Sequence, residues 1–200
     1  MGESRHNPNQ LLKAIKADEE NRNKGHLKIF FGYAAGVGKT YAMLEAAHMA
    51  KQQGIDVVAG YIEPHSRPKT AALLNGLEVL PTREVLYNGM ILNEFDIDMA
   101  LKRKPQLILV DELAHTNAEG CRHAKRYQDI KELLNAGIDV YTTVNVQHIE
   151  SLCDTVASIT EIVVRERIPD SLFDNADQVE LIDIEPQDLI DRLNTGNVYR

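Results

Sequence analysis

The amino-acid sequence predicts an α/β fold in which a mainly parallel sheet is flanked by helices. Short, continuous apolar runs alternate along the 200 residues with longer amphipathic runs of helical period. Strands buried on both faces of a parallel sheet have this continuous apolar character, and helices connect them. A hydrophobic content of 44% is enough for one full α/β domain with its own core. Two of the apolar runs end in residues suited to bind a ligand.

The first elements form a strand, a helix and a second strand. An apolar run ends at Phe31, a turn of small residues follows, and an amphipathic run from Lys39 to Gln53 stops at Gly54. The next apolar run ends at Glu63. A βαβ unit of this kind crosses over in the right-handed sense. Before it, residues 1–24 are expected to be an N-terminal helix or linker, and residues 25–200 one domain.

A small β-hairpin excursion is expected near residues 77–95. Asn88-Gly89 lies between two apolar runs, and this dipeptide favours a two-residue hairpin turn. A short helix over 68–75 precedes the excursion, and a helix that Asp96 caps and that reaches Arg103 follows it. The remaining expected elements are strand 107–112, a helix to Asn135, strand 138–146, helix 147–160, strand 162–168, short helix 169–175, strand 179–184 and a helix from Pro186.

The turn that follows the first strand predicts a phosphate-binding loop and a fold similar to P-loop NTPases. A small-residue turn before a helix presents backbone N–H groups to an anion, Lys39 can reach the outer phosphates, and Thr40 can ligate magnesium. The phosphate-loop pattern has glycine where Tyr33 stands. An ordinary helix cap is the alternative. The expected nucleotide-binding residues are Gly32, Ala35, Gly36, Val37, Gly38, Lys39, Thr40 and Tyr41.

Two carboxylates at the end of a later strand strengthen this interpretation. The run Leu107 to Val110 is followed by Asp111 and Glu112. Asp111 is expected to hold magnesium together with Thr40, and Glu112 is the candidate catalytic residue that orients or deprotonates a water.

Other polar residues are expected around the same site. His115, Thr116 and Asn117 follow the carboxylates directly, and Thr142, Thr143 and Asn145 end the next strand. The basic residues 122–126 are expected to open a helix, where cations oppose the helix dipole, so a bound polyphosphate, an acidic partner or plain solvation could explain them. Arginines considered for charge stabilisation are Arg67, Arg122 and Arg126.

Composition limits the function classes. The formal net charge of −8 argues against nucleic acid as the main partner, because that affinity comes from Lys and Arg. No apolar run approaches the roughly 20 residues that span a bilayer, and no signal peptide is recognisable, so a cytoplasmic domain without membrane insertion is expected. The two cysteines suit a reducing compartment. Zinc is disfavoured because no paired Cys or His spacing occurs.

Five segments resemble the N-terminal cytoplasmic domain of KdpD sensor histidine kinases, which control potassium uptake. The segments are GVGKTYAML at 36–44, VDELAHTNA at 110–118, RHAKRYQDI at 122–130, AGIDVYTTVNVQHIESL at 136–152 and RIPDSLFDNADQVELID at 167–183. The likeness covers essentially residues 25–200.

The resemblance implies a regulatory domain that binds ATP and Mg. In the family this domain is followed by further domains of the same sensor kinase, lies on the cytoplasmic side of the bacterial inner membrane, and adjusts the balance of kinase and phosphatase activities. The 200 residues leave no room for a histidine kinase core. Two alternatives stay open: an autonomous Mg-dependent ATPase, and a non-catalytic interaction module whose phosphate loop is vestigial.

Overall fold

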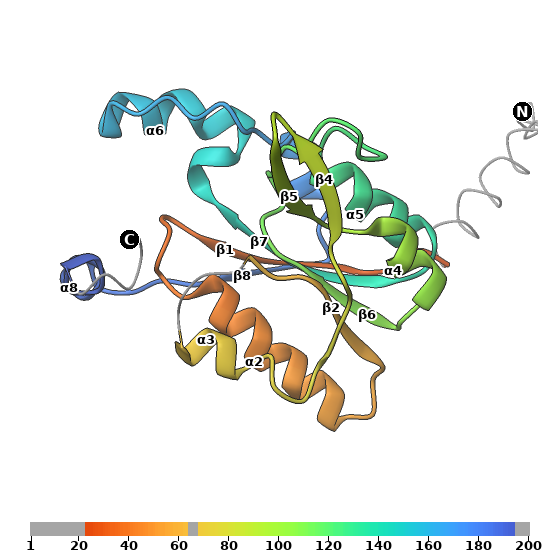
Figure 1. Cartoon of the computed structure of the whole chain (residues 1–200). Coiled ribbons are helices and arrows are strands. Elements are labelled where there is room, and N and C mark those ends of the chain that lie inside the picture. The colour runs from red at the N-terminus through yellow and green to blue at the C-terminus, as the bar shows by residue number, and fades with distance from the viewer. Residues whose placement is uncertain (1–22, 64–67, 195–200) are drawn as a thin grey trace, which may run out of the picture.

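A computed structural model describes residues 23–63 and 68–194 and confirms the predicted α/β fold (Figure 1). Its main sheet has six parallel strands in the order β3-β2-β6-β7-β1-β8. These strands are β1 (Leu27–Gly32), β2 (Val57–Tyr61), β3 (Glu78–Val79), β6 (Leu107–Val110), β7 (Asp139–Asn145) and β8 (Gln178–Leu181).

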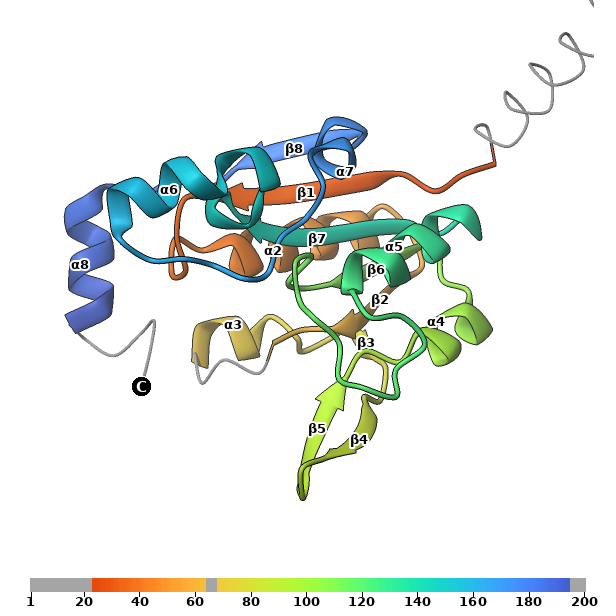
Figure 2. The same cartoon turned by 90° about the horizontal axis from the view of Figure 1, so that it is seen from above.

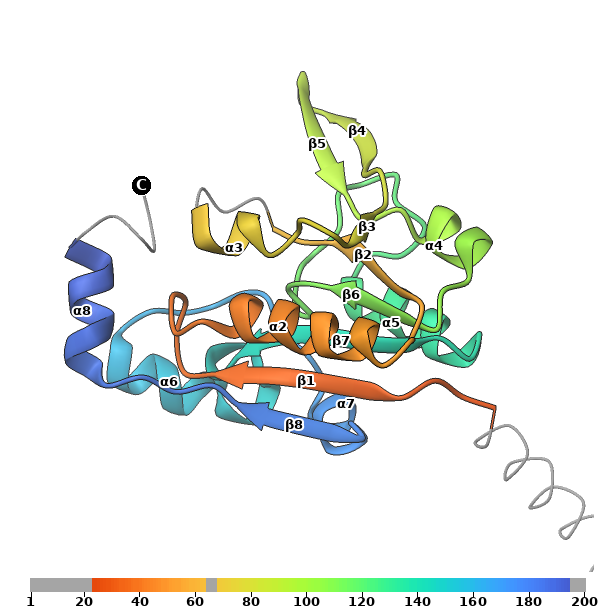
Figure 3. The same ribbon diagram turned by 90° about the horizontal axis from the view of Figure 1, so that it is seen from below.

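Helices lie on both faces of this sheet (Figures 1 and 3). α2 and α3 cover one face, whereas α4, α5 and α6 lie on the other. The helices are α2 (Lys39–Gln52), α3 (Pro68–Ala72), α4 (Ile97–Arg103), α5 (Arg126–Asn135), α6 (Cys153–Thr160), α7 (Asp170–Asp174) and α8 (Pro186–Asn194), with 3-10 helices η1 (Val146–His148) and η2 (Glu150–Leu152) before α6.

Each face of the sheet carries its own apolar core. Ile29 and Phe30 are neighbours in β1 and both are fully buried, but they belong to different cores. Phe30 packs with Leu44 beneath α2, and Ile29 lies in the core that includes Ile130 of α5. Because both sides of the strand are covered, its sequence is continuously apolar rather than alternating.

The order of the strands brings three strand ends together. β7 lies between β6 and β1, and Gly32 at the end of β1 is paired with Asn145 at the end of β7. Leu109 of β6 pairs with Tyr141 of β7. The loops that leave β1 and β6 therefore begin at the same edge of the sheet, and this is the edge at which open parallel sheets bind ligands.

The predicted hairpin is present, with narrower limits than expected. β4 (Arg83–Tyr87) and β5 (Met90–Glu94) form a two-stranded antiparallel sheet that projects from the body, as Figure 2 shows. Residues 78–79, which were expected to belong to the excursion, instead pair with β2 as β3 at the edge of the main sheet. Asp96 caps α4 as predicted, since its Oδ1 accepts from the N–H of Met99 at 3.0 Å.

Three element predictions were wrong. Residues 162–167 form no strand, and Ile168 makes only an isolated bridge with Ile149. The helix expected from residue 147 becomes α-helical only at Cys153, after η1 and η2. α5 begins at Arg126, so the other basic residues of 122–126 lie in the preceding loop.

Some expectations fall outside the described residues. These are the N-terminal helix within residues 1–22 and Arg67. Among residues 23–63 and 68–194, no helix has the length and apolar character that crossing a membrane requires.

Candidate functional site

The turn between β1 and α2 presents a set of backbone donors without internal acceptors. Gly36 has φ 92° and Gly38 has φ 113°, values in the left-handed region that favours glycine. In the part of the chain that the structure describes, the N–H groups of Ala35, Gly36, Val37 and Gly38 donate to no other residue. No side chain caps α2, a helix of 14 residues, and its first turn has no acidic residue. The turn therefore suits an anion.

Gly32 and Tyr33 form the entrance to this loop, where the phosphate-loop pattern has glycine in place of Tyr33. A Cβ on Gly32 would lie 2.7 Å from Val37 Cγ2 and 3.1 Å from Lys39 Cδ, so only glycine fits at this position. Tyr33 is 37% exposed, and its hydroxyl donates to the carbonyl of Ile184 at 3.1 Å. The Tyr33 side chain thus forms a hydrogen bond with the C-terminal part of the chain.

Lys39 and Thr40 begin α2 and face the interior of the site. Lys39 is only 8% exposed, and its Nζ donates to the carbonyl of Ala34 at 2.9 Å. The Thr40 hydroxyl donates to Asp111 Oδ2 at 3.1 Å. The structure thus joins the first turn of α2 to the end of β6, two segments that the sequence placed in one site.

Asp111 is the centre of this polar group. It is 1% exposed, and its Oδ1 accepts from the Thr143 hydroxyl and, at 3.2 Å, from the N–H of Glu112. The Glu112 N–H also points at Thr143 Oγ1 at 3.2 Å. Among the sequence candidates on β7, Thr143 reaches the acidic pair, whereas Thr142 Oγ1 and Asn145 Oδ1 are buried without a hydrogen-bond partner in the described chain.

Glu112 lies beside Asp111 in an unusual backbone conformation, with φ 60°. Burial raises the pKa of its carboxyl to about 7, and the charges of Asp111 and Glu63 act in the same direction. Glu63 follows β2 and was not among the sequence candidates. A carboxyl with a raised pKa in such a setting is typical of functional sites.

Among the expected ligand-binding residues, Tyr41 has the most exposed side chain. Its side chain is 39% exposed, and the nearby charge of Glu45 raises the pKa of its hydroxyl. Gly32 ends β1, and the remaining expected residues, from Ala35 to Thr40, lie in the turn or in the first residues of α2.

Comparisons with known proteins agree with the sequence resemblance. The family model described as KdpD, osmosensitive K+ channel His kinase sensor domain, matches residues 23–200. The chain belongs to this family. It is 62% identical over 196 residues to the sensor protein KdpD of Clostridium acetobutylicum and 55% identical over 195 residues to that of Escherichia coli.

These relatives are much longer than the chain. The two alignments cover 98% of this chain but 22% and 21% of the relatives. A putative sensor protein KdpD of Synechocystis is 52% identical over 176 residues, which are 88% of this chain and 48% of that protein. The chain therefore spans about a fifth of the first two relatives and about half of the third.

The loop from Glu112 to Lys125 in this KdpD-family domain is held by carboxylates from other parts of the chain. His115 Nε2 lies 3.0 Å from Glu94 Oε2, and the Asn117 amide donates to Asp129 Oδ2 at 2.7 Å. The Thr116 N–H donates to Glu166 at 2.8 Å. Residues 115–117, which the sequence placed around the candidate site, thus contact the carboxylates of Glu94, Asp129 and Glu166.

The basic residues after this loop also have internal partners. Arg126 is 0% exposed, donates to Glu94 Oε2 at 3.1 Å and to the backbone carbonyl of Asp111 at 3.2 Å, and stacks 4.0 Å from the ring centre of Tyr61. Arg122 donates to Asp98 and Glu132 on the outside. In this KdpD-family domain Arg126 thus supports Asp111 from behind. No sequence pattern had indicated that role.

Proposed function

We propose that this KdpD-family domain binds ATP with magnesium at the β1–α2 turn, and that occupancy of the turn adjusts the kinase and phosphatase activities of a longer sensor kinase. The observation that carries the proposal is the row of unpartnered loop amides beside the Thr40–Asp111 pair. Backbone donors at a helix N-terminus suit phosphate, and a hydroxyl next to a carboxylate suits magnesium.

The residues at the turn suit both the phosphate groups of ATP and the magnesium ion. Thr40 and Asp111 supply hard oxygen ligands, which magnesium prefers. Lys39 already lies at the turn, where its Nζ donates to Ala34, and can exchange this carbonyl for a phosphate oxygen. Bound magnesium would neutralise part of the phosphate charge. The four amides, the lysine and the buried carboxylate all belong to one edge of the sheet.

Calorimetric titration of magnesium-ATP into the 200-residue chain tests the site. We expect saturable binding by the unchanged chain, weakened at least tenfold by Lys39→Ala because the cation at the turn is lost. Lys51→Ala is the matched control, since Lys51 lies in the last turn of the same helix and its loss should leave affinity unchanged. Absence of binding at millimolar ATP would contradict the proposal and favour an interaction module.

The regulatory part of the proposal needs the longer protein. In a full-length relative, the equivalent of Lys39→Ala should change the ratio of autophosphorylation to phosphatase activity at fixed ATP. An unchanged ratio, with nucleotide binding abolished, would separate binding from regulation.

A hydrolytic function is the second candidate, and the position of Glu112 favours it. The Glu112 backbone N–H is held by Asp111 and Thr143, which fixes the carboxyl next to the proposed magnesium ligand. A carboxylate so placed can orient or deprotonate a water. Phosphate release should then be measurable, and Glu112→Gln should abolish it while retaining ATP binding. If the two proteins release phosphate at the same rate, Glu112 has no catalytic role.

A further inference from the structure

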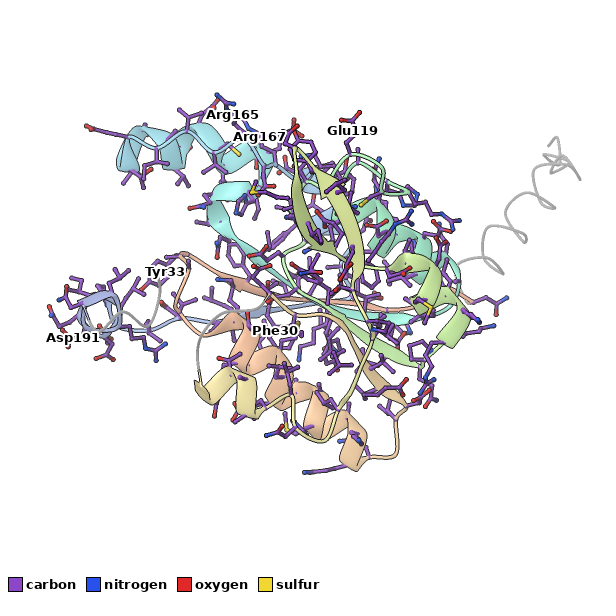
Figure 4. The ribbon with its side chains drawn as sticks, in the orientation of Figure 1. Phe30, Tyr33, Glu119, Arg165, Arg167 and Asp191 are labelled. Carbon is purple, nitrogen blue, oxygen red and sulfur yellow. The ribbon has the colours of Figure 1, made fainter. Side chains whose placement is uncertain are left out.

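The C-terminal helix α8 is attached to the body through the β1–α2 turn. α8 contains no buried residue. Just before it, the N–H of Ile182 donates to the carbonyl of Phe31 at 2.7 Å, and the Ile184 carbonyl accepts from Tyr33. Figure 4 shows Tyr33 and the α8 residue Asp191 at the same end of the molecule. The stretch from β8 into α8 thus follows the strand and loop that carry the proposed phosphate site.

Arg192 on α8 makes the most direct contact with this turn. Its Nη1 donates to the carbonyl of Gly36 at 2.9 Å and lies 3.4 Å from the carbonyl of Val37. The same nitrogen would lie 3.8 Å from a Cβ placed on Gly38. The guanidinium therefore lies against the turn and holds it from its carbonyl side.

These two carbonyls belong to the peptide units that carry two of the unpartnered donors. The Gly36 carbonyl shares a plane with the N–H of Val37, and the Val37 carbonyl shares one with the N–H of Gly38. The peptide bonds of this loop are trans, so in each unit the C=O and the N–H point in opposite directions. A cation that holds both carbonyls on one side directs both N–H groups to the other side. It also polarises the peptide units, which strengthens their donors.

We propose that Arg192 is a positioning residue for the phosphate-binding turn, and that it couples occupancy of the turn to the attachment of α8. The inference rests on the proposed function, because it assigns a role at the same site. Arg192 acts through the loop backbone. An anion at the amides and the guanidinium at the carbonyls favour the same orientation of the two peptide units.

The coupling is reciprocal by thermodynamic necessity. If the docked Arg192 increases affinity for the anion, then the bound anion stabilises the docked α8 by the same factor. α8 is suited to respond, because its attachment does not depend on an apolar core. Loss of the arginine should therefore weaken binding and also make α8 insensitive to ligand.

The test combines calorimetry with hydrogen exchange on the 200-residue chain. Magnesium-ATP and, separately, inorganic tripolyphosphate are titrated into the unchanged chain and into Arg192→Ala, Arg192→Lys and Arg167→Ala. Exchange of the α8 amides is followed with and without each ligand. We expect Arg192→Ala to weaken binding of both ligands about tenfold and to remove the ligand-dependent protection of α8. Arg192→Lys should recover part of both effects, since a lysine can reach one carbonyl.

The controls distinguish a failure of the Arg192 inference from a failure of the proposed ATP site. Arg167 is an exposed arginine on the segment after α6, and its replacement should change neither measurement. Because Arg192 is not in a core, Arg192→Ala should unfold at the same temperature as the unchanged chain. Equal affinity in Arg192→Ala, or α8 protection that still responds to ligand, would overturn the inference and leave the proposed function standing. Absence of binding by the unchanged chain would overturn both.

Discussion

Two loops begin at the same edge of the sheet and differ in whether their polar groups have hydrogen-bond partners within the chain. The turn of residues 33–38, after β1, leaves consecutive backbone N–H groups without acceptors in the described chain. The loop of residues 112–125, after β6, is held by Glu94, Asp129 and Glu166. The first loop is nearly free of charged side chains, whereas the second is rich in them.

The difference shows which groups are available to a ligand. Buried donors are normally paired, so a row of open amides at a helix start is the more informative signal. The basic residues near 122–126 are conspicuous in the sequence, yet Arg122 and Arg126 already donate to carboxylates of the same chain. The first loop thus leaves backbone donors without partners in the described chain, whereas the second is held by contacts with other parts of the chain.

The largest expected effect comes from replacing Arg126, the buried arginine that contacts both Glu94 and the backbone of Asp111. Arg126→Met should lower the free energy of unfolding by about 3–5 kcal/mol, because it removes the buried guanidinium and leaves the Glu94 carboxylate with only His115 and the Ala118 N–H as partners. Urea denaturation measures the change. The matched control is Arg165→Met on an exposed arginine, expected within about 0.5 kcal/mol of the unchanged chain. A loss below about 1 kcal/mol for Arg126→Met would show that Glu94 does not depend on it.

An intermediate effect concerns Glu112 at the start of the second loop. The unfolded carboxyl ionises near pH 4.3, whereas the folded carboxyl has a pKa of about 7 because of burial and its acidic neighbours. The folded chain therefore loses stability as pH rises between these values, and Glu112→Gln escapes this loss. In magnesium-free buffer the variant should gain roughly 2–3 kcal/mol over the unchanged chain at pH 8, and almost nothing at pH 4. Thermal unfolding at both pH values checks this; a pH-independent difference would contradict it.

The smallest expected effect compares a glycine from each loop. Gly38 has φ 113° and Gly120 has φ 99°, and neither position is crowded. Alanine at either position should cost about 1–2 kcal/mol of stability, since an L residue is strained there. Only Gly38→Ala should also weaken magnesium-ATP binding, because only its turn carries the open amides. Equal loss of binding in both variants would remove the proposed distinction between the loops.

Local patterns were enough to predict most of the fold. The run before Gly32 and the run before Asp111 have the composition of strands covered on both faces, and both are central strands. Asn88-Gly89 fixed the hairpin, and Asp96 marked the start of α4, because turns and caps depend on a few adjacent residues. The strand expected at 162–168 did not form, although its residues partly alternate, because strand formation also requires a neighbouring strand to pair with, and that depends on distant residues.

The sequence predicted the backbone arrangement of the candidate site better than its side-chain contacts. Glycine spacing and a carboxylate at a strand end identified the turn and Asp111, since these signals are local. The roles of Arg126 and Arg192 were not accessible, because each depends on which distant element packs nearby. Arg126 looked like a surface cation at a helix start, and Arg192 like any polar residue of a terminal helix. Only the arrangement in space shows that one lies behind Asp111 and the other against the turn.

The place of β1 in the sheet has a consequence for synthesis of the chain. β1 and its glycine turn precede the other described elements in the chain, but both strands that flank β1, β7 and β8, come from the second half of the sequence. A nascent chain that ends before Val140 has nothing to pair with Leu27, so the turn has no rigid base. The candidate site can therefore form only after β1 has paired with β7 and β8, and such long-range pairing is slow compared with helix formation. The first strand of the sheet in chain order is thus among the last to gain its partners.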